Sequence, residues 1–119
     1  MGCRSMKIQV TRNVFTPKFV VGRISVNGQF KGFTSEGVNG LPAGEYQATV
    51  DDYGLLIGGA DNIRICQEGT PKCIRVGRTV NLQTGVLTNA ESAYNELIDK
   101  VKRESGPNEP IVVEIKEIK

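Results

Sequence analysis

The dipeptide Asn27-Gly28 separates two segments, Val20–Val26 and Gln29–Ser35, that have the composition of paired strands. Asn and Gly tolerate the positive φ angles that a type I′ turn requires at both of its central residues, and this turn matches the twist of two antiparallel strands. The sequence therefore predicts a β-hairpin across residues 20–35.

Several other segments also have the pattern of strands. Some alternate apolar and polar residues, which is typical of a strand with one buried face, and others are short and apolar, which is typical of a buried strand. The predicted strands are Met6–Arg12, Glu45–Asp51, Ile63–Cys66, Cys73–Gly77 and Pro110–Ile118.

Three segments are predicted as connections. Gly37–Gly44 is rich in turn residues, and the stretch from Asp52 to Asn62 contains many Gly, Asp and Asn residues but no clear period. Arg78–Thr88 also lacks a period, so we expect a loop there.

One helix is well specified near the C-terminus. Thr88 followed by Glu91 has the spacing of a capping box, in which each side chain accepts a hydrogen bond from a backbone N–H group of the first turn. Gly106-Pro107 is expected to end the helix. The apolar residues fall at helical spacing and form one stripe: Ala90, Ala93, Tyr94, Leu97, Ile98 and Val101.

These elements predict an α+β fold. We expect mostly antiparallel β-structure, a sheet or a small barrel of about seven strands, with one C-terminal amphipathic helix that covers the sheet or the mouth of the barrel. The chain of 119 residues suits one domain, residues 6–119, preceded by a flexible N-terminal extension, residues 1–5.

Composition excludes several classes of function. The chain has 15 Lys and Arg against 13 Asp and Glu, and a net charge of +2 gives no reason to expect binding to nucleic acid or to a membrane. It contains no histidine, so it cannot supply a Cys–His pair or a Ser–His–Asp triad. We expect no metal site and no cofactor. The sequence shows no signal peptide and no transmembrane segment.

The densest group of reactive and charged residues surrounds two cysteines, Cys66 and Cys73. Three arginines, Arg64, Arg75 and Arg78, are close to them in sequence. Cationic neighbours favour a thiolate, which would make Cys73 a plausible nucleophile. The alternative is that both cysteines are structural, either as small buried side chains or as a local disulfide.

The order of several motifs resembles a family of small uncharacterised domains found mainly in phages and bacteria. That family has a Thr-Arg opening, a Thr-Leu-Glu motif, a Pro-Ala-Gly-x-Tyr turn, an Ile-x-Ile-His…Gly-Cys-Ile-x-Val-Gly core and an Asn-Ser-x-x-Ala helix. The matching segments here are Val10–Arg12, Thr34–Glu36, Leu41–Tyr46, Ile63–Cys66, Lys72–Gly77 and Asn89–Leu97.

The core of that family is similar to that of L,D-transpeptidases, in which a His-activated Cys attacks a peptidoglycan carbonyl. The resemblance places Cys73 at the nucleophile and Arg75 at the following arginine. It places Cys66 at the histidine and Lys72 at the glycine before the nucleophile. Without the base, proton transfer loses a factor of about 10²–10⁴ in rate. The resemblance therefore implies a scaffold whose catalytic pair is lost.

From this resemblance we expect a non-catalytic accessory or structural domain of phage type. It would be a protein-interaction module in a virion or its assembly, located in the host cytoplasm or the virion. One alternative is a residual Cys-dependent peptidoglycan acyltransferase or cell-wall-binding module, with Cys73 and Arg75 at the reaction centre and Arg64, Cys66, Lys72 and Arg78 binding. Another alternative is a redox-responsive Cys66–Cys73 pair.

Overall fold

The computed structural model describes residues 6–37, 42–51, 54–57, 63–66, 73–104 and 111–118. The predicted extension, residues 1–5, lies outside these ranges. The elements are β1 (Met6–Phe15), β2 (Val20–Val26), β3 (Gln29–Glu36), β4 (Gly44–Asp51), β5 (Gly54–Ile57), β6 (Ile63–Cys66), β7 (Cys73–Gly77), β8 (Thr79–Val80), β9 (Leu87–Thr88), α1 (Ala90–Glu104) and β10 (Ile111–Glu117).

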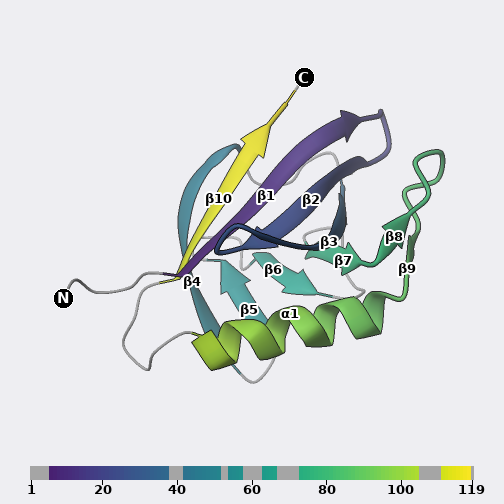
Figure 1. Cartoon of the computed structure of the whole chain (residues 1–119). Helices are drawn as coiled ribbons and strands as arrows, with labels where there is room; N and C mark the ends of the chain where they lie inside the picture. Colours follow the sequence, from purple (N-terminus) through teal and green to yellow (C-terminus); the bar gives the residue numbers. More distant parts are fainter. Residues whose placement is uncertain are drawn as a thin grey trace.

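The main feature of the fold is a sheet that curls and closes on itself (Figure 1). Within the described residues, eight strands pair in the order β1-β10-β4-β5-β6-β7-β3-β2, and β2 pairs with β1 to complete a barrel. Most neighbours are antiparallel, while β1–β10 and β6–β7 are parallel. The predicted mostly β fold with a single helix is confirmed in this part of the chain.

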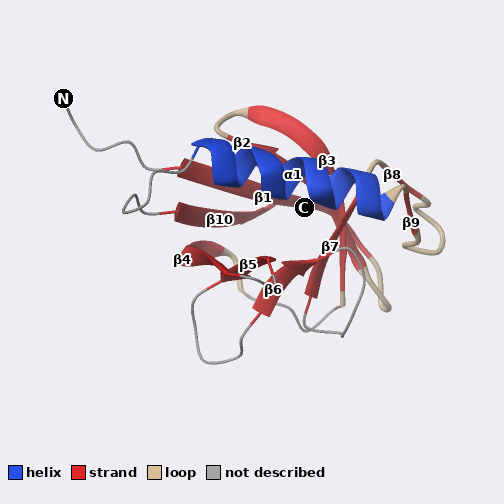
Figure 2. Cartoon of the chain, turned by 90° about the horizontal axis from the view of Figure 1, so that it is seen from below, coloured by secondary structure: helices blue, strands red, loops and turns tan. Residues whose placement is uncertain are grey.

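The helix lies against the barrel rather than apart from it. In Figure 2, which views the molecule from below, α1 crosses in front of the strands, and it packs next to β7 and β3. It is not the last element, because β10 follows it and occupies a place between β1 and β4. The helix is therefore an insertion before the strand that closes the barrel.

The buried side chains of the alternating strands and of the helical stripe together form the core. In β1 the side chains of Met6, Ile8 and Val10 are buried, while Lys7 between them is exposed. The apolar stripe of α1 belongs to the same cluster through Ala93, Leu97, Ile98 and Val101. An eight-stranded barrel is just wide enough for side chains to fill it. Here apolar side chains from the strands and the helix do so.

The hairpin prediction is also confirmed. Asn27 and Gly28 both have positive φ, 49° and 86°, and β2 pairs with β3 on either side of them. The Asn27 side chain also accepts a hydrogen bond from the Lys7 backbone N–H at 2.9 Å. The turn is thereby tied to β1, the other neighbour of β2.

Two predicted connections contain strands instead. Gly54–Ile57 forms β5, in which Leu55 and Ile57 are buried between β4 and β6. A segment of four residues is too short to show a period in the sequence. The segment expected as a loop from Arg78 to Thr88 contains the two-stranded sheet β8–β9, which lies beside β3 in Figure 1.

The predicted capping box is wrong. Thr88 is the last residue of β9, and its hydroxyl is hydrogen-bonded to that of Thr79 on β8. The helix begins at Ala90, after Asn89 with a φ of 51°. Thr88, which the sequence pattern assigned to the start of the helix, therefore belongs to the β8–β9 pair.

Among the described residues, no helix combines the length and the apolar character needed to cross a membrane.

Candidate functional site

The structure brings the predicted site residues onto two adjacent strands. β6 and β7 run parallel, with the backbone of Arg64 opposite Cys73 and that of Cys66 opposite Arg75. The side chains of Arg64 and Cys66, and the whole of Lys72, lie outside the described part of the chain. The side chains described at this predicted site are those of Cys73, Arg75 and Arg78.

Cys73, the predicted nucleophile, is half-buried at the start of β7 and is disulfide-bonded. The other cysteines of the chain are Cys3 and Cys66. The nucleophile in Cys chemistry is the thiolate, and a disulfide sulfur carries no ionisable thiol. In this form Cys73 must be reduced before it could attack a carbonyl.

Both arginines bond to the chain itself. Arg75 donates from Nη2 to the Ser35 hydroxyl at 3.4 Å and so joins β7 to β3. Arg78 donates from Nη2 to Ser92 Oγ at 3.1 Å and to Glu96 Oε2 at 2.5 Å, both on α1. These contacts give the two arginines a structural role in holding β3 and α1 near β7.

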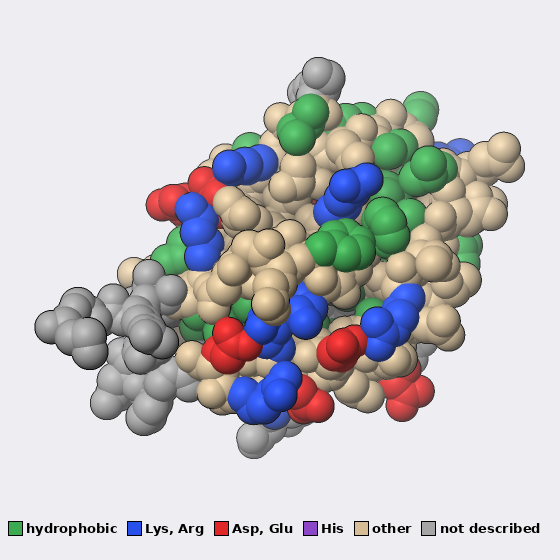
Figure 3. Space-filling view, in the orientation of Figure 1, with side chains coloured by type: hydrophobic (Ala, Val, Ile, Leu, Met, Phe, Trp, Pro, Cys, Tyr) green, Lys and Arg blue, Asp and Glu red, His purple; other side chains and the backbone are tan. Residues whose placement is uncertain are grey.

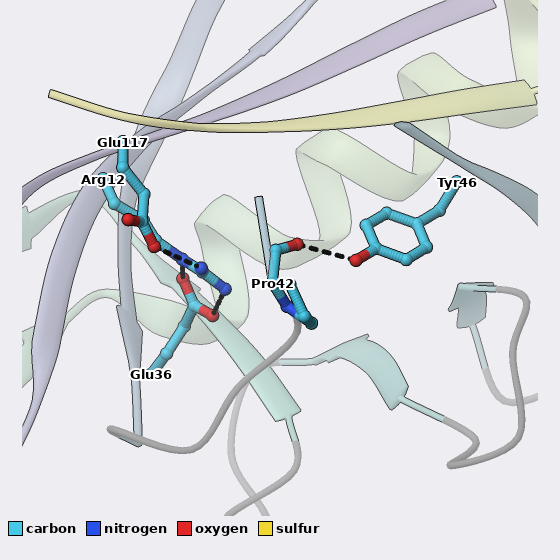
Figure 4. A network of polar contacts seen from close by, with 5 residues as sticks. All are labelled: Arg12, Glu36, Pro42, Tyr46 and Glu117. Atoms are coloured by element: carbon cyan, nitrogen blue, oxygen red, sulfur yellow. Dashed lines mark hydrogen bonds and ion pairs between the residues drawn. The ribbon is translucent and has the colours of Figure 1, made fainter. Parts of the chain in front are cut away.

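A buried ionic cluster, which the sequence reading missed, lies at the far end of β1 (Figure 4). Arg12 and Glu36 are only 4% and 2% exposed. Arg12 donates from Nε and Nη2 to the two carboxylate oxygens of Glu36 at 3.0 and 2.7 Å, and from Nη1 to Glu117 at 3.2 Å. The cluster joins β1, β3 and β10.

The electrostatics of this cluster favour the ionised arginine. Burial by itself lowers the pKa of Arg12, but hydrogen bonding and charge attraction from Glu36, and then from Glu117, outweigh it. The net effect raises the pKa of Arg12 above its ordinary value. Because three guanidinium nitrogens already donate to the chain's own carboxylates, the cluster is built to hold strands rather than to bind an anion.

Tyr46 stands on the other side of Pro42 from this cluster in Figure 4. Its hydroxyl donates to the Pro42 carbonyl at 2.7 Å. The Pro-Ala-Gly-x-Tyr motif seen in the sequence thus includes a hydrogen bond that fixes the start of β4. Like Arg12 and Glu36, which belong to the other quoted motifs, Tyr46 has a structural role.

A second group of side chains projects outward from β2 and β3, and we call it the Phe30–Phe33 surface: Arg23, Phe30, Lys31 and Phe33. Phe30 is 54% exposed, and its ring meets that of Phe33 edge-on, with centroids 5.3 Å apart. The Arg23 guanidinium lies 6.0 Å from the centroid of the Phe33 ring, within the range of a cation–π contact. In the orientation of Figure 3, hydrophobic and basic side chains lie side by side on the visible face of the molecule.

A β-bulge places the two phenylalanines on the same side. In an uninterrupted strand, residues three apart point to opposite faces. In β3 the register shifts, so that Ile24 pairs with Gly32 and Ser25 with Phe30, which makes Lys31 the extra residue of a bulge. Gly32 has a φ of +153°, and a Cβ there would lie 2.6 Å from the Gly77 carbonyl oxygen.

An open depression lies beside this surface. It has a volume of about 120 Å³ and is lined by Phe30, Lys31, Gly32, Arg78 and Glu96. Two of the lining residues, Arg78 and Glu96, form an ion pair with each other. An exposed aromatic ring, basic side chains and a hollow therefore meet where β3 approaches α1.

Within the described residues, no group of three or more His, Cys, Asp or Glu side chains could hold a metal ion. Comparison with protein-family models, curated proteins and solved structures finds no match.

Proposed function

We propose that this chain is a non-catalytic protein-interaction module that binds its partner through the Phe30–Phe33 surface. The observation that carries the proposal is the exposure of Phe30, 54%, in a ring pair that a bulge holds on the outside of the barrel. Contiguous apolar groups that are exposed and rimmed by polar side chains are typical of protein–protein interaction sites. Aromatic and arginine side chains are also enriched among the residues that dominate binding energy.

The state of the predicted reaction centre supports the non-catalytic part of the proposal. Cys73 is disulfide-bonded, and Arg75 and Arg78 bond to side chains of the same chain. The sequence also contains no histidine to act as a base. Turnover of muropeptides by the reduced protein, abolished by Cys73→Ala, would contradict this part.

The setting we propose is a phage-type accessory or structural role, in a virion or its assembly, and hence the host cytoplasm or the virion. It rests on the resemblance of the ordered motifs from Val10 to Leu97. The structure gives several of these motifs a role in stability, as for Arg12 with Glu36 and for Tyr46 with Pro42. A scaffold of this kind supports binding without any retained chemistry.

Photo-crosslinking tests the interaction. A benzophenone amino acid placed at Phe30 should form a covalent adduct with one protein in extracts of the organism that encodes the chain. The matched control carries the same group at Gln47, which is exposed on β4, a strand that neighbours neither β2 nor β3. Identical adducts from both positions, or none from position 30, would contradict the proposal.

A redox-responsive cysteine pair is a second candidate function, favoured by the disulfide of Cys73. We propose Cys66 as its partner, since the two residues lie on paired parallel strands. Intact mass should rise by about 2 Da on reduction, in the wild type and in Cys3→Ser but not in Cys66→Ser. A mass shift that persists in Cys66→Ser would exclude this pairing.

A further inference from the structure

We propose that the partner bound by the Phe30–Phe33 surface is an acidic protein segment that presents an aromatic side chain. This inference rests on the proposed function and adds the chemistry of the partner. The carboxylates of the segment would pair with Arg23 and Lys31, and its ring would pack against Phe30 in the adjoining depression.

The charge of the surface calls for an acidic partner. Arg23 is exposed and Lys31 is half-buried, and neither forms an ion pair with a carboxylate among the described residues. Glu96 is the carboxylate that lines the depression, and it is paired with Arg78. Two cations beside the phenylalanines thus remain for carboxylates from outside, which electrostatic complementarity would attract and orient.

The shape of the surface favours a partner that carries an aromatic side chain between the carboxylates that pair with Arg23 and Lys31. The depression has a volume of about 120 Å³, well above the roughly 10–15 Å³ that one water molecule needs, so it has room for a side chain. Phe30 lines the depression, and its ring packs edge-on against that of Phe33. An incoming ring can make the same kind of offset or edge-on contact with Phe30. The bulge holds this arrangement before binding, which reduces the ordering cost of association.

A single-stranded nucleic acid would fit the surface less well. Such ligands are bound by a basic groove that follows the phosphates and by aromatic faces on which successive bases stack. Here the Arg23 guanidinium lies over the Phe33 ring, where a base would have to stack. The Glu96 carboxylate also lines the depression and would repel a phosphate. The net charge of the whole chain is also only +2. Carboxylates spaced by an aromatic side chain match these features better than a run of phosphates.

Binding of defined polymers to the full chain tests the inference. The probe is a random copolymer of glutamate and tyrosine, and the comparisons are polyglutamate, a copolymer of lysine and tyrosine, and single-stranded oligo-dT. Isothermal titration should detect binding of the glutamate–tyrosine copolymer that weakens as salt is raised. Polyglutamate should bind less tightly, and the lysine–tyrosine copolymer should not bind.

Three variants assign the binding to the surface. Phe30→Ser and Arg23→Ser should each weaken binding of the glutamate–tyrosine copolymer by about tenfold, whereas Gln47→Ser on β4 should leave it unchanged. All three positions are exposed, so the variants should stay folded in circular dichroism, with at most a small drop in unfolding temperature where a contact with Phe33 is lost. The salt dependence should fall in Arg23→Ser and stay the same in Phe30→Ser.

Several results would overturn the inference. Tighter binding of oligo-dT would identify a nucleic-acid surface, and dimerisation abolished by Phe30→Ser in light scattering would identify a second copy as the occupant. Equal affinities for polyglutamate and the glutamate–tyrosine copolymer would show that the partner needs no aromatic side chain. If no polymer binds but the crosslink at position 30 still captures one protein, the acidic chemistry fails while the proposed function stands.

Discussion

Arg12 occupies a position in β1 where alternation places the side chain inside the barrel. The residue follows Met6, Ile8 and Val10 in that inward series. Its charge is accommodated because Glu36 supplies a bidentate partner and Glu117 a third acceptor. A buried pair of this kind adds little stability compared with apolar residues, but it is costly to break.

Removing one partner of the pair should therefore be strongly destabilising. Arg12→Met is expected to lower the free energy of unfolding by about 3–5 kcal/mol, because it leaves the Glu36 carboxylate buried without compensation. Glu117→Gln should cost less than about 1 kcal/mol, since the Glu117 side chain is 30% exposed. Urea unfolding measures both. The double variant Arg12→Met/Glu36→Met should regain most of the loss, and equal costs for Arg12→Met and Glu117→Gln would contradict this account.

Thr34 is a second polar residue inside the barrel, fully buried on β3 next to Glu36. Its hydroxyl oxygen has no hydrogen-bond partner among the described residues. Leaving such a group unpaired costs about 1–3 kcal/mol. Thr34→Val should therefore raise the stability, by about 1 kcal/mol, in urea unfolding. Thr34→Ser, which keeps the hydroxyl and removes a methyl group, should lower it, and a destabilised Thr34→Val would show that the hydroxyl is satisfied in solution.

The surface carboxylate Glu114 gives the chain a dependence on pH. Its hydrogen bond from Gln9, with further contributions from Lys7 and Lys116, lowers the pKa of Glu114 below its ordinary value. A lowered folded-state pKa contributes stability that is present above the unfolded value, about 4.3, and is lost as the pH falls through the folded value. Glu114→Gln should thus destabilise at about pH 6 in urea unfolding, and this cost should shrink as the pH is lowered below about 4. Gln9→Ala should reduce this difference, and a cost that does not change with pH would contradict the assignment.

At the scale of elements, the sequence predicts what depends on local pattern. The Asn27-Gly28 turn, the alternation in β1 and the stripe of α1 are visible because each is a property of neighbouring residues. β5 and the β8–β9 pair are not visible, because four- and two-residue strands are defined by their partners rather than by a period. The same holds for the candidate surface. Its aromatic residues are plain in the sequence, but their common orientation depends on the bulge at Lys31.

That bulge can be tested at Gly32. Gly32→Ala should destabilise the protein by about 1–3 kcal/mol, because its backbone conformation disfavours a side chain and a Cβ would meet the Gly77 carbonyl oxygen at 2.6 Å. Gly28→Ala is the matched control, since Gly28 also has a positive φ but has no atom within 4 Å of a Cβ. It should cost less, and NMR shifts of the Phe30 and Phe33 rings should change only in Gly32→Ala. Equal costs and unchanged ring shifts in both variants would contradict a role for the close approach to Gly77.

At the scale of the whole molecule, β10 closes the barrel of the described residues. β10 pairs in parallel with β1 and antiparallel with β4, and it adds Ile111, Val113 and Ile115 to the core. β1 and β10 are therefore neighbours although they are far apart in sequence, and the barrel cannot close before β10 is in place. The sequence pattern predicts that β10 is a strand, but it does not predict that β10 pairs with β1 and β4, because those partners are far away in sequence.

A chain truncated before β10 should consequently fail to fold, rather than form a smaller version of the same barrel. A chain ending at residue 110 loses three buried side chains and leaves both β1 and β4 as unpaired edges, which favours aggregation. We expect no cooperative thermal transition by circular dichroism and self-association in light scattering. A chain ending at Glu117 is the control, because it loses Ile118, which is exposed and whose N–H donates to the Arg12 carbonyl, but keeps every strand. If the shorter chain stayed monomeric and unfolded cooperatively, the barrel would not depend on β10, and the cluster of Arg12 with Glu117 would lose its role in closure.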